Sequence, residues 1–253
     1  MKATAIIPAR YGSTRFPGKP LALINGLPMI QHVCQRVSRA TTVDRVIVAT
    51  DDKRIVAAVE AFGGDVMLTR TDHPTGTDRL AEVAANIDSD LIVNVQGDEP
   101  LIDPRMVDQA VAPLVENPQI QMGTLASAID EIGDFHNPNV VKVVKRQDGL
   151  ALYFSRASIP WPRDLDTAQL AAELPRLGVL RHIGLYVYRR QLLLDYPTWP
   201  KTPLENLENL EQLRALERGI GLYVAETEFS CHGVDTPADL ERVSKLLSLE
   251  INN

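Results

Sequence analysis

"IIPARYGSTRFPGKP", residues 6–20, carries an apolar segment into a loop with two glycines, two prolines and the cations Arg10, Arg15 and Lys19. A Walker phosphate loop needs four residues between its glycines and Ser or Thr after its lysine; here five separate the glycines and proline follows Lys19. The closely spaced glycines of a dinucleotide fingerprint are absent too. The loop therefore predicts phosphate binding by cationic side chains beside a backbone that glycine allows to approach closely. A solvated basic loop is the alternative.

The first half of the chain alternates short apolar runs with amphipathic segments. Strands are predicted over 4–9, 45–50, 65–68 and 91–95, and helices over 28–40, 52–64 and 77–87. Strands that are apolar on both faces and joined by helices indicate an α/β fold, with a mostly parallel Rossmann-like sheet covered by helices on both faces. Ligands bind beyond the carboxyl ends of such strands. We therefore expect loops 8–20, 50–52, 70–78 and 96–100 to gather around one pocket.

The second half changes character. Strands are predicted over 122–129, 139–146, 149–156 and 182–189, with a hairpin turn at 145–149. We interpret them as a strand-rich insertion that covers the pocket. A helix with leucine at every third place is predicted over 204–219, and a closing amphipathic helix over 236–250. No long linker interrupts the sequence, so one domain over 1–253 is expected, with parts at 1–120, 121–200 and 201–253.

Composition limits the classes of function. The net charge of −7 argues against a general nucleic-acid binder, so the basic loop is a local concentration of cations in an acidic protein. Cys34 and Cys231 lack metal-type spacing and are expected to be reduced thiols. The first residues show no leader pattern, and no apolar run reaches the roughly 20 residues of a membrane helix. A cytoplasmic protein without membrane insertion is expected.

Two acidic residues follow strand-like segments. Asp98 lies in "NVQGDEP" (94–100) after a predicted buried strand, and Asp235 lies in "GVDTP" (233–237) before the closing helix. Carboxylates at such places commonly hold Mg²⁺ together with substrate phosphate oxygens. Each could instead cap a helix, and for Asp235 the two interpretations are equally supported.

The segment "HPTGTDR" (73–79) runs from a loop into a helix start. Its glycine and hydroxyl groups suit backbone recognition of a nucleobase or ribose, and Arg79 could reach a base carbonyl. Taken alone this signal is weak, because Thr and Asp at a helix start are ordinary capping residues.

Seven motifs in order resemble one family: "IIPARYGSTRFPGKPL", "HPTGTDRLAEV", "NVQGDEPLI", "ALYFSRASIPW", "RHIGLYVYR", "LENLEQLRALE" and "GVDTPADLE". Together they span residues 4 to 243 and resemble the 3-deoxy-manno-octulosonate (Kdo) cytidylyltransferases, or CMP-Kdo synthetases. The resemblance implies a nucleotide-diphospho-sugar-transferase-like fold and a homodimer paired through the strand-rich part. It also implies a reaction of CTP with the anomeric hydroxyl of Kdo that gives CMP-Kdo and pyrophosphate, needs Mg²⁺ and serves lipopolysaccharide synthesis.

The resemblance also implies residue roles. Cations and metal ligands that would act in catalysis are Arg10, Lys19, Asp98 and Asp235, with Arg15 as a further phosphate contact. The cytidine would be surrounded by Pro8, Ala9, Thr75, Gly76, Thr77 and Arg79. The sugar acid would be bound by Gln96, Arg156, His182, Tyr186, Glu211 and Gln212. Thr75 departs from the expected serine but keeps a hydroxyl, and segment 164–177 is assigned no role.

These roles fit the chemistry of the residues. Nucleotidyl transfer depends on positioning and charge neutralisation more than on a protein nucleophile. Arg156 suits a sugar carboxylate because a guanidinium can donate two parallel hydrogen bonds to it. His182 alone would be read as a structural residue, and only the resemblance makes it a contact to a sugar hydroxyl.

Three other functions remain open at this point. A sibling enzyme that accepts 8-amino-Kdo or another acidic sugar would share the CTP motifs. An NAD-dependent oxidoreductase is disfavoured by the missing glycine fingerprint. A non-catalytic nucleotide-binding regulator would have no need of the paired acids Asp98 and Asp235.

Overall fold

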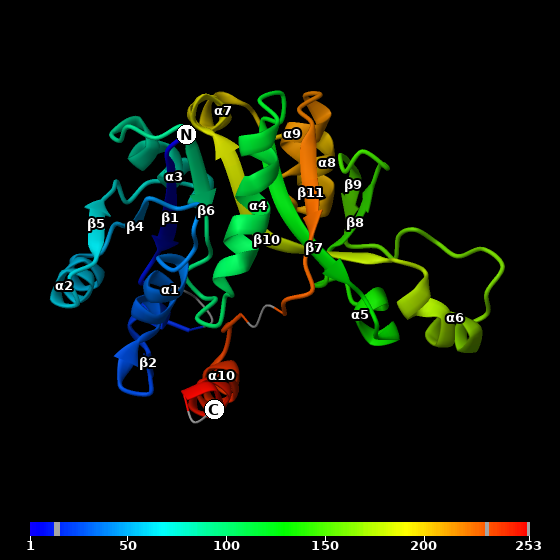
Figure 1. The fold of residues 1–253 in the computed structure, drawn as a ribbon, viewed down its shortest axis with the longest axis horizontal. Coiled ribbons are helices and arrows are strands. Elements are labelled where there is room, and N and C mark those ends of the chain that lie inside the picture. Colours follow the sequence, from blue (N-terminus) through cyan, green and yellow to red (C-terminus); the bar gives the residue numbers. More distant parts are fainter. Residues whose placement is uncertain (13–15, 231–232, 252–253) are drawn as a thin grey trace.

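The computed structural model describes residues 1–12, 16–230 and 233–251. Within these ranges a nine-stranded sheet forms the centre of the molecule (Figure 1). Its spatial order is β11 (Leu222–Glu226), β7 (Met122–Ala128), β10 (Leu180–Arg189), β6 (Leu91–Asn94), β1 (Ala3–Ala9), β4 (Arg45–Thr50) and β5 (Asp65–Leu68), with β8 (Lys142–Lys145) and β9 (Ala151–Ser155) attached beside β10. A small separate hairpin joins β2 (Leu23–Ile24) to β3 (Leu27–Pro28).

The sheet is mostly parallel along its main path. β1 pairs in parallel with β4 and β6, β4 with β5, and β7 with β11, whereas β10 runs antiparallel to both of its neighbours. The predicted α/β class with a mostly parallel sheet is confirmed. Strands β7, β10 and β11 extend this same sheet, and the β8–β9 hairpin branches from it through pairing of β8 with β10. The second-half strands are therefore part of the sheet, not a separate insertion, and the predicted turn between β8 and β9 is confirmed.

Helices cover both faces of the sheet. On one face lie α1 (Met29–Val37), α2 (Lys53–Ala61) and α4 (Pro104–Glu116) (Figure 1). On the other face lie α3 (Gly76–Ala85), α7 (Arg190–Asp195), α8 (Pro203–Glu208) and α9 (Leu213–Glu217). Neighbouring strand residues face opposite clusters, as Ile6 and Ile7 do, which explains why these strands are apolar throughout. Helix α4 was not predicted; Asp103 caps it and Pro104 occupies its first turn.

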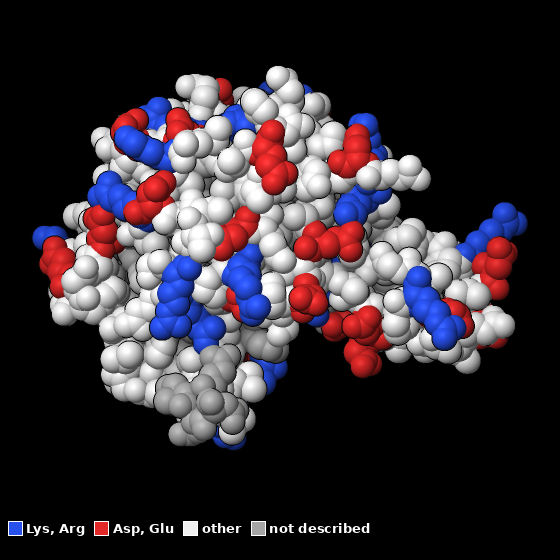
Figure 2. Space-filling view, viewed as in Figure 1, with Lys and Arg blue, Asp and Glu red and all other residues white. Residues whose placement is uncertain are grey.

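Three helices lie outside the two covering layers. α5 (Ile132–His136) and α6 (Thr167–Glu173) form an arm with its own apolar cluster (Figure 1). The closing helix, α10 (Pro237–Ile251), packs against the β2–β3 hairpin. Short 3₁₀ turns span Lys19–Leu21, Leu174–Arg176 and Tyr196–Thr198. On the face in Figure 2, Lys and Arg side chains are interspersed with Asp and Glu side chains.

The continuous helix predicted over 204–219 is wrong. The segment forms α8 and α9, because Asn209 adopts a left-handed conformation with φ of 51° and ends α8. Leu207, on α8 before the break, is 81% exposed, whereas Leu210 and Leu213, after the break, are buried. Asn tolerates this backbone conformation better than most residues, which is why the break occurs there.

Candidate active site

One cavity of about 400 Å³ opens at the carboxyl end of the parallel strands. Eight of the predicted site residues line it: Pro8, Ala9, Arg10, Lys19, Thr75, Gly76, Gln96 and Asp98. Pro8 and Ala9 are the last residues of β1, and the others lie on the segments that follow β1, β5 and β6. The expectation of a shared pocket is confirmed for loops 8–20, 70–78 and 96–100, whereas loop 50–52 does not line it. We refer to this pocket as the loop cavity. Arg15 lies outside the described residues.

Close packing of two strand ends shapes this cavity. A Cβ atom added to Gly97 would lie 2.9 Å from the carbonyl oxygen of Pro8 and 3.4 Å from Ile7. A contact under 3 Å with backbone would force the chains apart, so only glycine allows the loop after β6 to pass this close to β1. At Gly76 an added Cβ would make only an ordinary contact, 3.7 Å, with the ring of Pro8.

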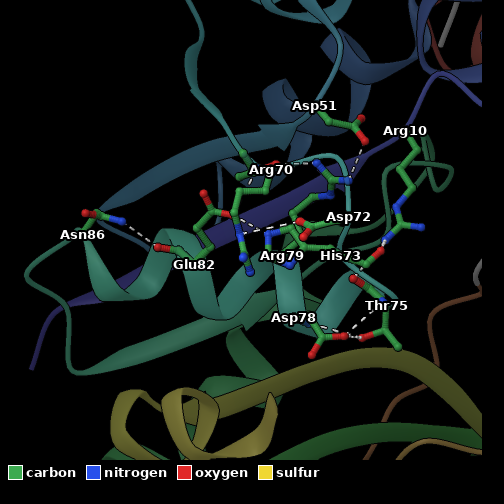
Figure 3. Close-up of polar contacts among 11 residues, drawn as sticks. Arg10, Asp51, Arg70, Asp72, His73, Thr75, Asp78, Arg79, Glu82 and Asn86 are labelled. Carbon is green, nitrogen blue, oxygen red and sulfur yellow. Dashed lines mark hydrogen bonds and ion pairs between the residues drawn. The ribbon is translucent and has the colours of Figure 1, made fainter. Parts of the chain in front are cut away.

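Arg10 joins the loop after β1 to the loop before α3. Its guanidinium donates hydrogen bonds to the carbonyl oxygens of His73, at 2.8 Å, and Thr75, at 3.0 Å (Figure 3). The Thr75 hydroxyl and the Asp78 carboxylate form a capping box at the start of α3. The Thr75 side chain is therefore engaged in holding the helix end, while Gly76 presents its backbone to the cavity.

The loop before α3 is held in place by contacts with Glu82 on that helix. The buried ring of His73 contacts the carboxylate of Glu82, which also accepts a hydrogen bond from the backbone N–H of Arg70 at 3.2 Å (Figure 3). Burial raises the pKa of Glu82, but the hydrogen bonds from His73 and Arg70 outweigh it and hold the pKa below its ordinary value. Glu82 thus stays ionised and fixes the His73 backbone whose carbonyl accepts from Arg10.

Arg79 does not line the loop cavity. Its side chain is fully buried, and one terminal nitrogen donates to Asp51 at 2.9 Å (Figure 3). The other terminal nitrogen contacts the hydroxyl of Thr69. The expected contact between Arg79 and a base carbonyl is therefore corrected to a supporting place beneath the loops that follow β4 and β5. The prediction failed because a basic residue in the first turn of a helix gives no sign of which way its side chain turns.

Lys19, Asp98 and Asp235 meet at the mouth of the loop cavity. The Lys19 Nζ lies 2.6 Å from the Asp98 carboxylate and 3.3 Å from that of Asp235. The backbone N–H of Val234 donates to the Asp98 carbonyl at 2.9 Å, so the two acidic segments lie side by side. Thr236, not Asp235, caps α10 by accepting from the Asp239 N–H at 3.3 Å. The capping interpretation of Asp235 is thereby set aside.

A second group of predicted residues lies around β10 and the turn between α8 and α9. We refer to His182, Tyr186, Glu211 and Gln212 as the β10 cluster. The rings of His182 and Tyr186 have centroids 5.3 Å apart, and His182 meets Phe154 edge to face at 5.0 Å. Burial lowers the pKa of His182 to about 3, so its ring is neutral at neutral pH.

Glu211 is the most unusual member of this cluster. Burial raises its pKa above the ordinary value, although hydrogen bonding to the Thr77 hydroxyl opposes that rise. Its Oε1 is buried without a hydrogen-bond partner among the described residues. The Tyr196 hydroxyl donates to its backbone carbonyl at 2.8 Å. Buried acceptors without a hydrogen-bond partner are rare in folded proteins. One is expected at a place where a bound ligand donates a hydrogen bond to it.

Gln96 and Thr77 connect the two groups. The Gln96 amide lines the loop cavity and donates to the Gly184 carbonyl on β10 at 3.0 Å. Thr77, in the first turn of α3, is buried, and its hydroxyl acts on the Glu211 carboxyl by lowering that group's pKa. A molecule that fills the loop cavity would therefore extend naturally toward β10.

Arg156 takes a different position from the one expected. Its guanidinium donates to the backbone carbonyls of Glu208 at 2.8 Å, Pro138 at 3.0 Å and Asn209 at 3.4 Å. In this arrangement it holds the end of α8 against the β8–β9 hairpin. Contact with a sugar carboxylate would require Arg156 to exchange some of these acceptors, so that role stays a prediction.

Sequence reasoning missed the residues that support these positions. Lys142 is fully buried and donates to three carbonyls, those of Asn137 at 2.9 Å, Val140 at 2.6 Å and Arg156 at 2.8 Å. The Glu208 carboxylate accepts from the Ser155 hydroxyl at 2.6 Å. A lysine within "NVVKVVKR" gives no sign of this, because alternation alone makes it look solvent-exposed.

Two further observations concern the Cys34 thiol and the lengths of the helices. Burial raises the pKa of the Cys34 thiol to about 12, which makes it a poor nucleophile. None of the helices in the described ranges has the length and apolar character that a membrane span requires.

Comparison with known proteins agrees with this geometry. A family model described as cytidylyltransferase matches residues 4–227. The 3-deoxy-manno-octulosonate cytidylyltransferase of Syntrophotalea carbinolica is 59% identical over 96% of this chain and 97% of its own. That of Geobacter metallireducens is 58% identical over 98% of each chain.

Solved structures extend the comparison. A CMP:2-keto-3-deoxy-manno-octonic acid synthetase complexed with CTP is 45% identical, with a TM-score of 0.91 over 99% of this chain and 100% of its own. A cytidylyltransferase from Leptospira borgpetersenii, 19% identical with a TM-score of 0.65 over 98% of this chain and 87% of its own, shows the shared fold alone. The chain therefore belongs to the cytidylyltransferase family, in the branch of the 3-deoxy-manno-octulosonate cytidylyltransferases.

Proposed function

We propose that this chain transfers CMP from CTP to the anomeric hydroxyl of Kdo and releases pyrophosphate, and that CMP-Kdo then serves lipopolysaccharide synthesis. The observation that carries the proposal is the convergence of Asp98 and Asp235 on Lys19 at the mouth of the loop cavity. These residues are widely separated in the sequence, and full-length similarity to a synthetase complexed with CTP supports the same substrate here.

In this proposal CTP occupies the loop cavity. Its cytidine lies against Pro8, Ala9 and the backbone around Gly76, and its phosphates extend toward Lys19. The N-terminus of α3 and the cations Arg10 and Lys19 favour negative charge at that end. Arg15 remains a predicted further phosphate contact.

Kdo would bind beside the β10 cluster, which Gln96 links to the loop cavity. The anomeric oxygen attacks the α-phosphorus, the bond from that phosphorus to the bridging oxygen breaks, and pyrophosphate leaves with the electron pair. The hydroxyl proton passes to solvent. Glu211 and His182 offer acceptors to sugar hydroxyls, and Arg156 is the candidate partner of the sugar carboxylate.

The donor set fits Mg²⁺. The carboxylates of Asp98 and Asp235, on adjacent loops, both contact the Lys19 ammonium group. Mg²⁺ typically takes one or two carboxylates together with substrate phosphate oxygens. The described residues contain no group of three or more His, Cys, Asp or Glu that could form a site without substrate. Asp98 and Asp235 would hold the ion, which when bound would neutralise charge on the triphosphate. Lys19 then remains to donate to the pyrophosphate.

A homodimer in the cytoplasm completes the proposal. Large apolar side chains are exposed on the second half of the chain, among them Trp161 at 64%, Leu152 at 57% and Leu177 at 41%. Exposed apolar side chains such as these are candidates for an association surface between two copies of the chain. Analytical ultracentrifugation tests this; a monomer at micromolar concentration would contradict it.

The decisive experiment measures pyrophosphate release with CTP, Kdo and Mg²⁺. Release should require all three and should be weak with UTP or ATP in place of CTP. Replacement of Kdo by its 8-amino analogue tests the sibling activity. Equal release without Kdo, or with UTP, would overturn the proposal, and full release after chelation of Mg²⁺ would remove the metal from it.

A further inference from the structure

Strand β10 contains a bulge beside the β10 cluster. Its register against β7 jumps: Ile183 lies opposite Leu125, whereas Tyr186 lies opposite the next residue, Thr124. The two residues between them have no register partner on β7 or on β6. A bulge of this kind leaves backbone groups of the inserted residues outside the regular ladder, and bulges are common next to active sites.

Side chains satisfy the carbonyl groups of this bulge. The Thr124 hydroxyl lies 2.7 Å from the carbonyl oxygen of Leu185 and 3.1 Å from that of Ile183. The carbonyl between them, that of Gly184, accepts from Gln96. Thr124 is only 1% exposed, so water does not replace it in this role.

The same hydroxyl lies 3.0 Å from Nε2 of His182. A threonine hydroxyl has one proton to donate and lone pairs that accept. Carbonyl oxygens can only accept, so the Thr124 hydroxyl donates its proton to the carbonyl oxygen of Leu185 or of Ile183. The hydroxyl oxygen must therefore accept a hydrogen bond from Nε2–H of His182. Nε2 of His182 therefore carries the ring proton, and Nδ1 is left as an acceptor.

We propose that Thr124 is a positioning residue that holds His182 as its Nε2–H tautomer, so that Nδ1 accepts a hydrogen bond from a hydroxyl of the sugar acid. Among the described residues Nδ1 has no hydrogen-bond partner. Phe154 and Tyr186 pack against the ring and restrict its rotation. The role at the sugar rests on the proposed function, whereas the tautomer follows from the bulge geometry alone.

The chemistry of this arrangement selects its ligand. A neutral ring with a bare Nδ1 accepts from O–H or N–H donors and repels a carboxylate oxygen placed at the same point. Such a group recognises a sugar hydroxyl and leaves the carboxylate of the sugar acid to another residue. The low pKa of His182 is consistent with this, because the neutral ring persists across the working pH range.

The tautomer is tested directly by nitrogen NMR of histidine-labelled protein, with His182→Ala to assign the signal among the five histidines. The expected spectrum shows a protonated Nε2 and a bare Nδ1, and addition of Kdo with CTP should shift Nδ1. In Thr124→Val the second tautomer should become populated, and Thr124→Ser should keep the wild-type pattern. A bare Nε2 in the wild-type protein would overturn the inference whether or not Thr124→Val folds.

Kinetics test whether the positioning matters. Loss of one oriented hydrogen bond should raise the KM for Kdo about tenfold in Thr124→Val, with the Kd for CTP unchanged. Thr124→Ser should restore the wild-type KM. Ser127→Ala, which removes a hydroxyl elsewhere on β7, should leave KM unchanged.

A double-mutant cycle separates positioning from general packing. In the His182→Ala background, Thr124→Val should cause no further rise in the KM for Kdo if it acts through His182. An additive effect would mean that Thr124 only supports the strand, and would overturn the inference. If His182→Ala itself leaves the KM for Kdo unchanged, the proposed sugar site is wrong, while the tautomer measured by NMR still decides the geometry.

Discussion

The loop cavity is formed by loops that follow parallel strands, whereas the β10 cluster is formed by a bulged antiparallel strand and by the turn between two short helices. In the first region the topology of the sheet brings the residues together, because parallel strands end at the same edge. In the second, individual side chains bring them together: Thr124 and Gln96 satisfy the bulge, and Arg156 holds the end of α8. The first region is consequently robust to single changes outside it, and the second depends on a few buried polar contacts.

The largest effect is expected from a substitution that disrupts the turn carrying part of the β10 cluster. Arg214 and Glu205 form an ion pair whose side chains are only 6% and 5% exposed. Removal of one partner leaves a buried charge, so Arg214→Met should lower the free energy of unfolding by about 3–5 kcal/mol. It should also raise the KM for Kdo, because Glu211 and Gln212 lie on the turn that this pair holds.

Urea unfolding and the two substrate affinities check this prediction. The matched control is Arg218→Met, an exposed residue stacked over Trp199 at the end of the same helix, which should cost less than about 1 kcal/mol. If Arg214→Met weakened CTP binding as much as Kdo binding, the two regions would not be independent.

Asp98→Asn tests the loop cavity. It removes a carboxylate that we assign to the metal, so turnover should fall about 100- to 1000-fold, a loss comparable to that of one electrostatic catalytic group. The Asp98 side chain is 33% exposed, and stability should change little. The measurement is kcat across a magnesium titration, with thermal melting alongside.

Asp88→Asn serves as the control for that variant, because Asp88 forms only a surface pair with Lys2 and its side chain is 92% exposed. It should behave as wild type. An Asp98→Asn enzyme with full kcat at saturating magnesium would contradict the assignment.

Gly97→Ala tests the close approach of the strand ends. The added Cβ would meet the Pro8 carbonyl at 2.9 Å, so the variant should lose about 1–3 kcal/mol of stability and bind CTP more weakly. Gly133→Ala is the control, because nothing lies within 4 Å of its added Cβ and the residue is in α5. Equal stability of the two variants would show that the contact relaxes without cost.

The smallest effect concerns pH. Burial lowers the pKa of His182 to about 3, whereas in the unfolded chain it returns to about 6.5. Between these values the unfolded state binds more protons, so stability falls as pH falls from about 6.5 toward 3. His182→Gln removes this term.

Urea unfolding should therefore show that the free energy of unfolding falls between pH 7.5 and pH 5 by about 1 kcal/mol more in the wild type than in His182→Gln. His182 is only partly buried, which makes the expected difference smaller than full burial would give. The same acid loss in both proteins would mean that folding does not lower the pKa of His182.

The two regions also differ in how far sequence reasoning reaches. The loop cavity was predictable, since apolar strand runs followed by Gly, Pro and charged residues indicate the edge where ligands bind. Asp98 and Asp235 were predicted together only by chemistry and resemblance, and their shared contact with Lys19 agrees with that pairing. Arg79 shows the limit, because the direction of its side chain depends on Asp51 and Thr69, which belong to other loops.

By itself the sequence determined the α/β class, the loops that gather at the strand ends, and the family, because periodicity, glycine placement and ordered motifs are local properties of the chain. The tertiary structure alone decided the break at Asn209, the bulge in β10, the buried places of Lys142 and Arg79, and the proton position on His182. These features depend on which carbonyl groups and charges from distant segments need a partner once water is excluded. No local pattern records that requirement.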